Sequence, residues 1–179
     1  NDSTPLAYAL EREHPAVRSV IPDDAALAFV SDLLEDFGDE WVTKMMFHYR
    51  WYYQADRDFA QAWVVTSRDP VMEPDARRAM MQAFNDRQVG RMALVGCTEQ
   101  NRPVIEESYR FVLDTLDRHL RELPFLLGTR PSLGDFGLYG QLQILSVDPT
   151  PAAEMRARAI DVFCWLMRLD DASGVEGVW

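Results

Sequence analysis

Apolar residues recur along most of the chain at the three- and four-residue spacing of amphipathic helices. The clearest case is the segment over residues 104–121, whose apolar face consists of Ile105, Tyr109, Val112, Leu116 and Leu120. The period-two alternation that is typical of half-buried strands is absent from the sequence. The pattern therefore predicts an all-α fold, a helical bundle.

Proline, glycine and capping residues divide this pattern into separate helices. We expect helices over about residues 3–14, 25–53, 57–66, 75–95, 104–121, 132–145 and 152–169. The first helix ends at Pro15 and is followed by a linker that contains Pro22. The last residues, 170–179, are expected to form a loop.

The long helix over residues 25–53 has two different halves. In the first half, the periodicity places inside the protein the residues Leu27, Val30, Leu34 and Phe37. It places on the solvent side the polar residues Ser31, Asp32, Glu35, Asp36 and Asp39. Gly38 marks a point where the helix is expected to kink. The second half is apolar or aromatic nearly all round, so it should be buried or line a cavity.

Composition narrows the class of function. The 179 residues are 47% apolar, and 18 basic against 29 acidic residues give a net charge of −11. Nucleic acids and anionic membranes are bound through a basic face, so neither is expected as a partner. No apolar run approaches the roughly 20 residues of a membrane span. Cys97 and Cys164 lie far apart without a CxxC spacing, which favours a reduced, cytoplasmic setting.

Metal and hydrolytic sites have little support in the sequence. Glu11 and His14 have the Glu-x-x-His spacing of one helix of a di-iron bundle, but neither His48 nor His119 follows a glutamate by three residues. Zinc patterns and the G-x-S-x-G motif are also missing. Ser132 is explained by helix capping, and both cysteines are interpreted as inert. We therefore expect no metal site and no catalytic residue in this chain.

Met45, His48, Tyr49 and Tyr52 lie on one face of the predicted long helix, at spacings of three and four residues. Two interpretations are open. The set is ordinary core or interface packing, or it is the wall of a pocket for a flat or apolar ligand. The second interpretation is chemically reasonable because histidine and polarisable or aromatic side chains suit such a ligand.

Asp2 and Ser3, at the start of the first predicted helix, also allow two interpretations. They form a simple helix cap, or they hold a small zwitterion. In the second case, the carboxylate of the ligand meets Ser3 and the helix amides, and its ammonium group meets Asp2. Because the sequence starts without methionine and directly on this cap, we expect it to be a fragment of a longer protein.

The segment over residues 124–145 contains the strongest local signal. Ser132 can cap the helix that follows, and Asp135 falls at its third position, which is the spacing of a capping box. One stripe of this helix is formed by Leu138, Leu142 and Leu145, and another by Gly134, Gly137 and Gly140. A helix with these two stripes is expected to have close neighbours on both sides and to be central and buried.

The capping segment resembles the C-terminal helical domain of the glutathione transferase family. In that family a G-x-x-P-S-x-x-D loop opens the central core helix, and here its positions are Gly128, Pro131, Ser132 and Asp135. The N-terminal segment is similar to the end of the family's thioredoxin-like domain, where an acidic residue and a serine hold the γ-glutamyl end of glutathione. The resemblance implies that Asp2 and Ser3 bind glutathione.

The same resemblance implies a domain organisation. Residues 1–16 would be the last helix of a thioredoxin-like domain, residues 17–23 a linker, and residues 24–179 an all-α domain. The whole protein would conjugate glutathione, its co-substrate, to a small apolar electrophile and form a homodimer. This chain would supply the dimer interface and a substrate wall of Met45, His48, Tyr49 and Tyr52.

One departure from the family affects activity. The thiol-activating residue and the cis-proline of the family belong to a part of the thioredoxin-like domain that this sequence lacks. The chain alone is therefore expected to be inactive. The alternative function is a non-enzymatic helical module that uses the same fold for ligand binding or protein association.

Overall fold

The computed structural model describes residues 3–15 and 18–179. Its elements are α1 (Ser3–Glu13), α2 (Ala25–Phe37), η1 (Gly38–Val42), α3 (Thr43–Tyr52), α4 (Gln54–Arg68), α5 (Pro74–Val89), η2 (Met92–Val95), α6 (Arg102–His119), α7 (Leu133–Leu145), α8 (Pro149–Arg158) and α9 (Ile160–Asp170). In these described ranges no strand forms beyond an isolated bridge between Phe125 and Gly128, so the predicted all-α fold is confirmed.

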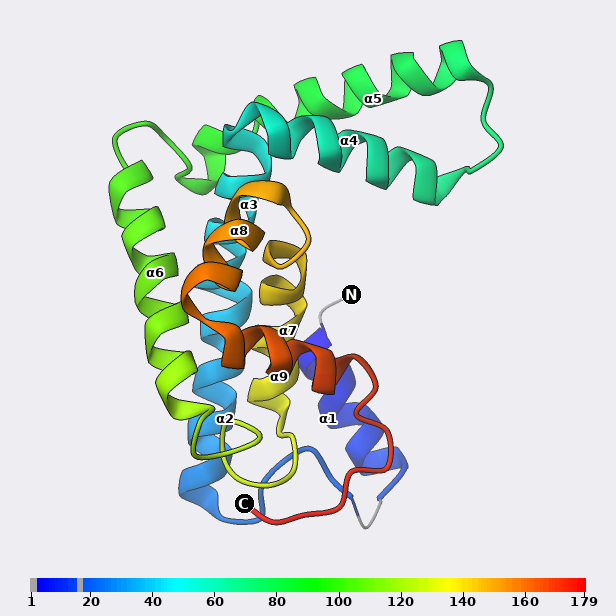
Figure 1. Ribbon diagram of the computed structural model, residues 1–179. Coiled ribbons are helices and arrows are strands. Elements are labelled where there is room, and N and C mark those ends of the chain that lie inside the picture. Colours follow the sequence, from blue (N-terminus) through cyan, green and yellow to red (C-terminus); the bar gives the residue numbers. More distant parts are fainter. Residues whose placement is uncertain (1–2, 16–17) are drawn as a thin grey trace.

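The central layer of the bundle is a long helical rod packed beside α7. The rod consists of α2, the π-helical turn η1 and α3, and η1 begins at Gly38, where a kink was expected. In Figure 1 the rod runs between α6 and α7, while α8 and α9 lie across them. The leucine stripe of α7, Leu138, Leu142 and Leu145, is fully buried in this core. The prediction of a central, buried α7 is therefore confirmed.

The predicted capping box forms at the start of α7. One oxygen of the Asp135 carboxylate accepts hydrogen bonds from the backbone N–H and the hydroxyl of Ser132, both at 2.8 Å. The other oxygen accepts from the Leu126 N–H at 2.9 Å and from the Trp165 indole N–H at 3.1 Å. Burial raises the pKa of Asp135, and these hydrogen bonds act in the opposite direction. The cap therefore joins the preceding loop and α9 to the first turn of α7.

The predicted faces of α2 are partly wrong. Ser31 and Glu35 were expected in solvent but are only 1% and 6% exposed, whereas Val30, expected inside, is 38% exposed. The reason lies in α7, whose Gly134 N–H donates to Ser31 Oγ at 3.0 Å. Because glycines have no side chain, the two helix backbones approach closely and a short polar residue fills the interface. The apolar residue Phe29 is left 67% exposed.

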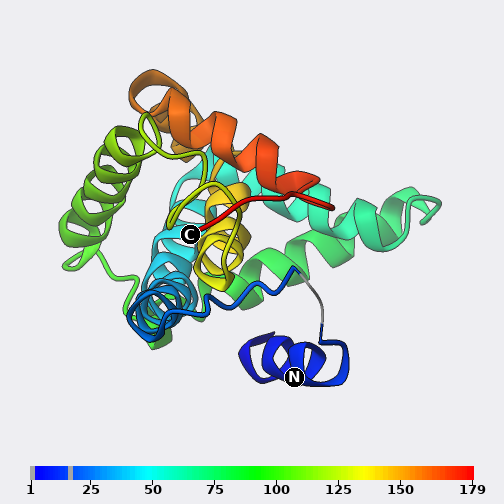
Figure 2. The same cartoon turned by 90° about the horizontal axis from the view of Figure 1, so that it is seen from below.

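Helices α4 and α5 form a hairpin that projects from one end of the bundle, as Figures 1 and 2 show. Both helices were predicted, but none of the described side chains of α5 is buried. The base of the hairpin is fixed by buried polar contacts. Arg50 of α3 makes two hydrogen bonds to Asp148, at 2.7 and 2.9 Å, and Asp56 of α4 accepts from the Thr150 N–H at 2.8 Å.

The two ends of the described chain lie on the outside of the bundle. Helix α1 lies apart from the other helices in Figure 2. The tail after α9 is a loop, as predicted, and is fixed to the loop before α7. The Thr129 N–H donates to the Val178 carbonyl at 2.8 Å, and the Val178 N–H donates to Thr129 Oγ1 at 2.9 Å. In the described part of the chain, the helices are too short or too polar to cross a membrane.

Candidate functional site

A cleft of about 420 Å³ lies between α1, the α2–η1 segment and α7. Ser3 of α1 lies on one side, Glu35 and Asp39 on the second, and Phe136 and Gly140 of α7 on the third. We call this the α1–α7 cleft. It is our candidate site because it brings the start of α1, where the sequence predicts a ligand, against the central helix of the bundle.

The α2–η1 side of the cleft is acidic. Glu35 accepts a hydrogen bond from the Thr4 hydroxyl, and nearby the Tyr8 hydroxyl donates to Asp32 at 2.7 Å. The hydrogen bond to Asp32, together with burial, raises the pKa of Tyr8 to about 12. The described lining of the cleft includes the carboxylates of Glu35 and Asp39 but no basic side chain. This side of the cleft therefore carries two acidic side chains.

The α7 side of the cleft is apolar and open. Leu133 and Phe136 line it together with Gly137 and Gly140. A β-carbon built on Gly140 would meet no atom within 4 Å, so this glycine borders empty space. A ligand can therefore place an apolar part against α7.

The structure describes one of the two predicted glutathione-binding residues. Ser3 is exposed at the N-terminus of α1 and lines the α1–α7 cleft. This is where the amides of a first helical turn can meet an anionic group. Asp2 lies outside the described residues. The glutathione-binding role of both residues stays a prediction.

The predicted substrate wall needs a correction. Met45, His48 and Tyr49 are at most 1% exposed, so a ligand cannot touch them in this structure. Met45 and Tyr49 belong to the apolar core. The His48 ring stacks on Tyr52 at a centroid distance of 4.8 Å, and Tyr52 is the one member of the set that is partly accessible. The set was correctly recognised as one helix face, but α6 and α8 cover that face.

A buried polar network surrounds these side chains. His48 Nε2 lies 3.2 Å from Glu106 Oε1 of α6, and the Tyr53 hydroxyl donates to the same oxygen at 2.6 Å. The Tyr49 hydroxyl donates to Glu154 of α8 at 3.1 Å. Burial lowers the pKa of His48, and the hydrogen bond to Glu106 opposes this effect. The network joins α3 to α6 and α8, which sequence reasoning missed because the partners are far apart in the chain.

The cysteines lie outside the described lining of the α1–α7 cleft, and possible metal ligands form no ligand set in the described structure. Cys97 is buried, which raises the pKa of its thiol to about 11, while Cys164 is exposed. Within residues 3–15 and 18–179, histidine, cysteine and carboxylate side chains form no group of three or more that could hold a metal ion.

A second groove, of about 380 Å³, lies between α2–η1 and α6. Phe37 and Trp41 line one side, and the exposed side chains of Val104 and Phe111 line the other. The exposed Leu33 lies one helical turn before Phe37, so it extends the same apolar stripe. We call this surface the α2–α6 face. The sequence did not reveal it, because the pattern of α2 placed the apolar residues inside.

The comparisons with known proteins agree with the fold. Residues 101–179 match the family model of the glutathione S-transferase C-terminal domain. This part of the chain belongs to that family. Neither the curated proteins nor the solved structures gave a match.

The matched segment of the glutathione S-transferase C-terminal domain contains α6, α7, α8 and α9, and with them the Ser132–Asp135 capping box. The resemblance noted in the sequence is therefore confirmed for residues 101–179. Helix α1, the acidic side of the cleft and the α4–α5 hairpin lie outside the match. The candidate cleft thus has one wall inside the matched segment and two walls outside it.

Proposed function

We propose that this chain is the helical part of a glutathione transferase-like protein that conjugates glutathione to a small apolar electrophile. The observation that carries the proposal is the α1–α7 cleft, which has Ser3 at one side and the central helix α7 at the other. The family membership of residues 101–179 supports the transferase-like part of the proposal. The N-terminus of α1 suits the γ-glutamyl carboxylate of glutathione, and the apolar α7 side suits the apolar electrophile.

In the proposed reaction, the thiolate sulfur of glutathione attacks an electrophilic carbon of the second substrate. A carbon–sulfur bond forms, and the leaving group departs with the electron pair of the bond that breaks. The γ-glutamyl carboxylate of glutathione binds Ser3 and the amides at the start of α1, and its ammonium group binds Asp2. We assign thiol activation to a residue outside residues 1–179, so these residues bind and orient the reactants.

The apolar electrophile is placed against α7 in this proposal. Leu133 and Phe136 line the cleft, and the space beside Gly140 is open. These residues replace Met45, His48 and Tyr49 as the substrate wall, because the latter are buried. Apolar contact with Phe136 would contribute most, since aromatic side chains provide large contact areas.

The α2–α6 face is the proposed homodimer interface. Its exposed residues Leu33 and Phe111 and the groove between them form an apolar surface, and such surfaces commonly mark protein association sites. A two-fold axis would pair this face with the same face of a second copy. We also propose a cytoplasmic location, because the free cysteines Cys97 and Cys164 suit a reducing compartment.

The test is an activity assay of the protein that contains this chain, with glutathione and an activated aryl halide. Ser3→Ala is expected to raise the KM for glutathione about tenfold, since it removes a hydrogen bond to a charged group. Phe136→Ala is expected to raise the KM for the aryl halide instead. The matched control is Ser67→Ala, an exposed serine of α4 in the projecting hairpin. It should leave both constants unchanged.

Three results would contradict parts of this proposal. Turnover by residues 1–179 alone would show that thiol activation resides within the chain. An unchanged KM for glutathione in Ser3→Ala would remove Ser3 from the site. If the whole protein conjugates glutathione to no electrophile tested, the alternative of a non-enzymatic helical module is favoured.

A further inference from the structure

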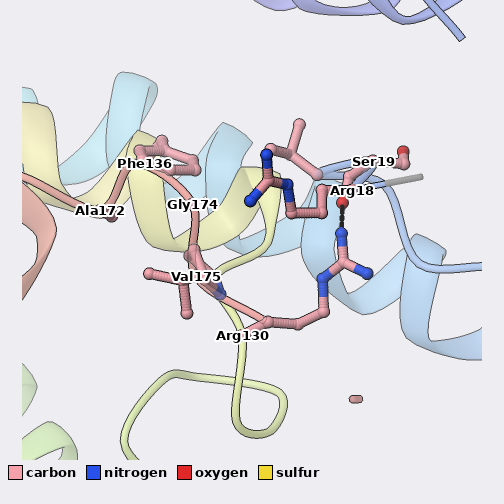
Figure 3. A pocket seen from close by; sticks show the side chains of 9 residues that line it. Arg18, Ser19, Arg130, Phe136, Ala172, Gly174 and Val175 are labelled. Carbon is pink, nitrogen blue, oxygen red and sulfur yellow. Dashed lines mark hydrogen bonds between the residues drawn. The ribbon is translucent and has the colours of Figure 1, made fainter. Parts of the chain in front are cut away.

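A small pocket of about 160 Å³ lies where three segments of the chain meet, as Figure 3 shows. Arg18 comes from the linker before α2, and Arg130 comes from the loop before α7. Gly174 and Val175 of the tail after α9 form another side, and Phe136 of α7 lines the pocket as well. We call this the arginine pocket. It is separate from the charged groups of the α1–α7 cleft.

The guanidinium group of Arg130 is held in place on two sides. It donates a hydrogen bond to the Ser19 carbonyl, drawn as the dashed line in Figure 3. Its central carbon lies 4.1 Å from the centroid of the Trp179 ring. An arginine side chain carries five N–H donors in a planar fork, and Ser19 engages one end of this fork. The remaining donors therefore stay available in a fixed orientation.

Arg18 lies across the pocket from Arg130 and has an acidic partner in the tail. Its Nη1 is 3.2 Å from Glu176 Oε1, and both side chains are exposed. The tail can pass close to this guanidinium because Gly174 has a φ of +74°, and a β-carbon there would lie 3.3 Å from Arg18 Nη1. Within the described chain, Glu176 is the carboxylate that contacts Arg18, whereas the hydrogen bond of Arg130 goes to the Ser19 carbonyl.

The position of the tail does not depend on the Arg18–Glu176 ion pair. A β-carbon on Gly177 would lie 2.6 Å from Thr129 Oγ1, and one on Gly128 would lie 2.3 Å from the Val178 carbonyl oxygen. These close backbone approaches, with the hydrogen bonds between Thr129 and Val178, fix the tail against the loop. An exposed ion pair adds little to such an attachment. Glu176 can therefore leave Arg18 without loss of the pocket.

Two guanidinium groups beside one small pocket are unusual in a chain with a net charge of −11. Guanidinium forks match the geometry of carboxylate and phosphate oxygens, and two of them strengthen the attraction. A volume of 160 Å³ is well above the roughly 10–15 Å³ that a cavity needs to hold one water, so the pocket has room for a small ion. We propose that the arginine pocket binds a small oxyanion, either inorganic or the carboxylate of a small organic acid, and that Glu176 competes with it for Arg18.

The arginine pocket adjoins the candidate cleft. Val20 and Phe136 line both of them, so a bound oxyanion would lie next to the acidic α1–α7 cleft. The proposal rests on Arg18 and Arg130 and makes no use of glutathione chemistry. Its outcome is therefore independent of the transferase assay.

The test is isothermal titration calorimetry of the protein with sodium phosphate and, separately, with sodium succinate at constant ionic strength. Arg18→Gln is expected to weaken binding about tenfold, because a charge-assisted hydrogen bond is lost. Glu176→Gln is expected to strengthen it about two- to fivefold by removing the internal competitor. Arg130→Lys keeps the charge but loses the fork, and we expect about tenfold weaker binding.

The matched control is Arg78→Gln, which removes an exposed arginine of α5, at the far end of the molecule from the tail. The affinity of the Arg78→Gln variant for each ion should equal that of the unchanged protein. Melting temperatures show whether each variant folds. Preference for phosphate or for succinate identifies the source of the oxyanion. No binding of either ion, equal weakening by Arg78→Gln, or a change below twofold in Arg18→Gln would overturn the proposal. Unchanged affinity in Glu176→Gln would overturn the competition by the tail.

Discussion

Gly137 of α7 lies directly against Glu35 of α2: a β-carbon built on Gly137 would be 2.8 Å from the Glu35 Cα. The obstructing atom belongs to the backbone, so it can move only if the two helices separate. We expect Gly137→Ala to lower the free energy of unfolding by about 1–3 kcal/mol, as overpacking of a close interface does. Urea denaturation followed by circular dichroism measures this change.

Gly140 is the matched control on the same helix. A β-carbon there would meet no atom within 4 Å, so Gly140→Ala adds no clash. Alanine restricts the unfolded chain and favours the helix, and the expected effect is a gain of about 0.5–1 kcal/mol. If both substitutions changed stability in the same direction, close packing of α2 on α7 would not be the reason that Gly137 is glycine.

The two cysteines are predicted to react very differently. Burial raises the pKa of the Cys97 thiol to about 11, and Cys164 is exposed. Because the thiolate is the reactive form, a disulfide reagent at pH 8 should modify Cys164 quickly and Cys97 slowly. Mass spectrometry after timed labelling distinguishes the two sites, with Cys97→Ala and Cys164→Ala as reference proteins. Equal labelling rates would contradict the burial of Cys97.

The pKa shift of Cys97 also predicts a pH dependence of stability. An ordinary thiol has a pKa of 9, so the unfolded state loses its proton at a lower pH than the folded state. The contribution of the protonated Cys97 thiol to the free energy of unfolding is complete below pH 9. It is lost as the pH rises toward about 11. Cys97→Ala should remove the part of the stability loss at alkaline pH that comes from this thiol. Denaturation at pH 8 and at pH 10.5 measures the loss. A profile identical to that of the unchanged protein would contradict this prediction.

Burial of His48 should make the stability of the folded protein depend on pH in the acidic range. Burial lowers its pKa, so on acidification the unfolded state takes up a proton before the folded state does. Stability should therefore fall as the pH drops through about 6.5, the value of an unfolded histidine. Compared with the unchanged protein, His48→Phe should lose less stability between pH 7 and pH 5. The exposed His14→Gln is the control, and it should keep the full acid dependence.

The Arg50–Asp148 ion pair joins the end of α3, just before the α4–α5 hairpin, to the start of α8. Asp148 is fully buried and its two oxygens accept hydrogen bonds from Arg50 at 2.7 and 2.9 Å. Asp148→Ala leaves the buried guanidinium without its partner, which typically costs about 3–5 kcal/mol. Asp75→Ala, which removes the exposed partner of Arg78, should cost less than about 1 kcal/mol. Similar losses of stability in Asp148→Ala and Asp75→Ala would show that burial of the Arg50–Asp148 pair is unimportant.

The α2–α6 face makes a prediction about assembly. Phe111→Glu introduces a charge at the exposed centre of this face, and we expect it to convert a homodimer into a monomer. Light scattering coupled to size-exclusion chromatography measures the mass. Val71→Glu adds the same charge to an exposed apolar residue of the hairpin and should leave the dimer intact. A monomeric unchanged protein would contradict the proposed interface.

Several features of the fold follow from neighbouring residues alone. Most helix positions were predictable because apolar spacing and terminal residues are properties of short segments. An exception is the single helix predicted over residues 152–169, which divides into α8 and α9 at Ala159. The Ser132–Asp135 capping box was predictable for the same reason, since both partners lie within one helical turn. The break at Gly38 was also expected, and it became a π-helical turn. These features require no knowledge of distant parts of the chain.

The candidate site depended on contacts that the pattern cannot show. Met45, His48 and Tyr49 form one helix face, but only the positions of α6 and α8 decide that this face is core. Glu35 was assigned to solvent and instead lines the α1–α7 cleft. Each error arises because a side chain's polarity does not specify which neighbour it meets.

The sequence by itself determined the all-α class, the order of the helices and the start of α7, because these depend on local spacing and hydrogen bonding. Only the tertiary structure decided which side of α2 is buried. Close backbone approach at Gly134 and Gly137 places Ser31 and Glu35 in the interface and leaves Phe29 in solvent. The physical reason is that residues about 100 positions apart set the space available to each other.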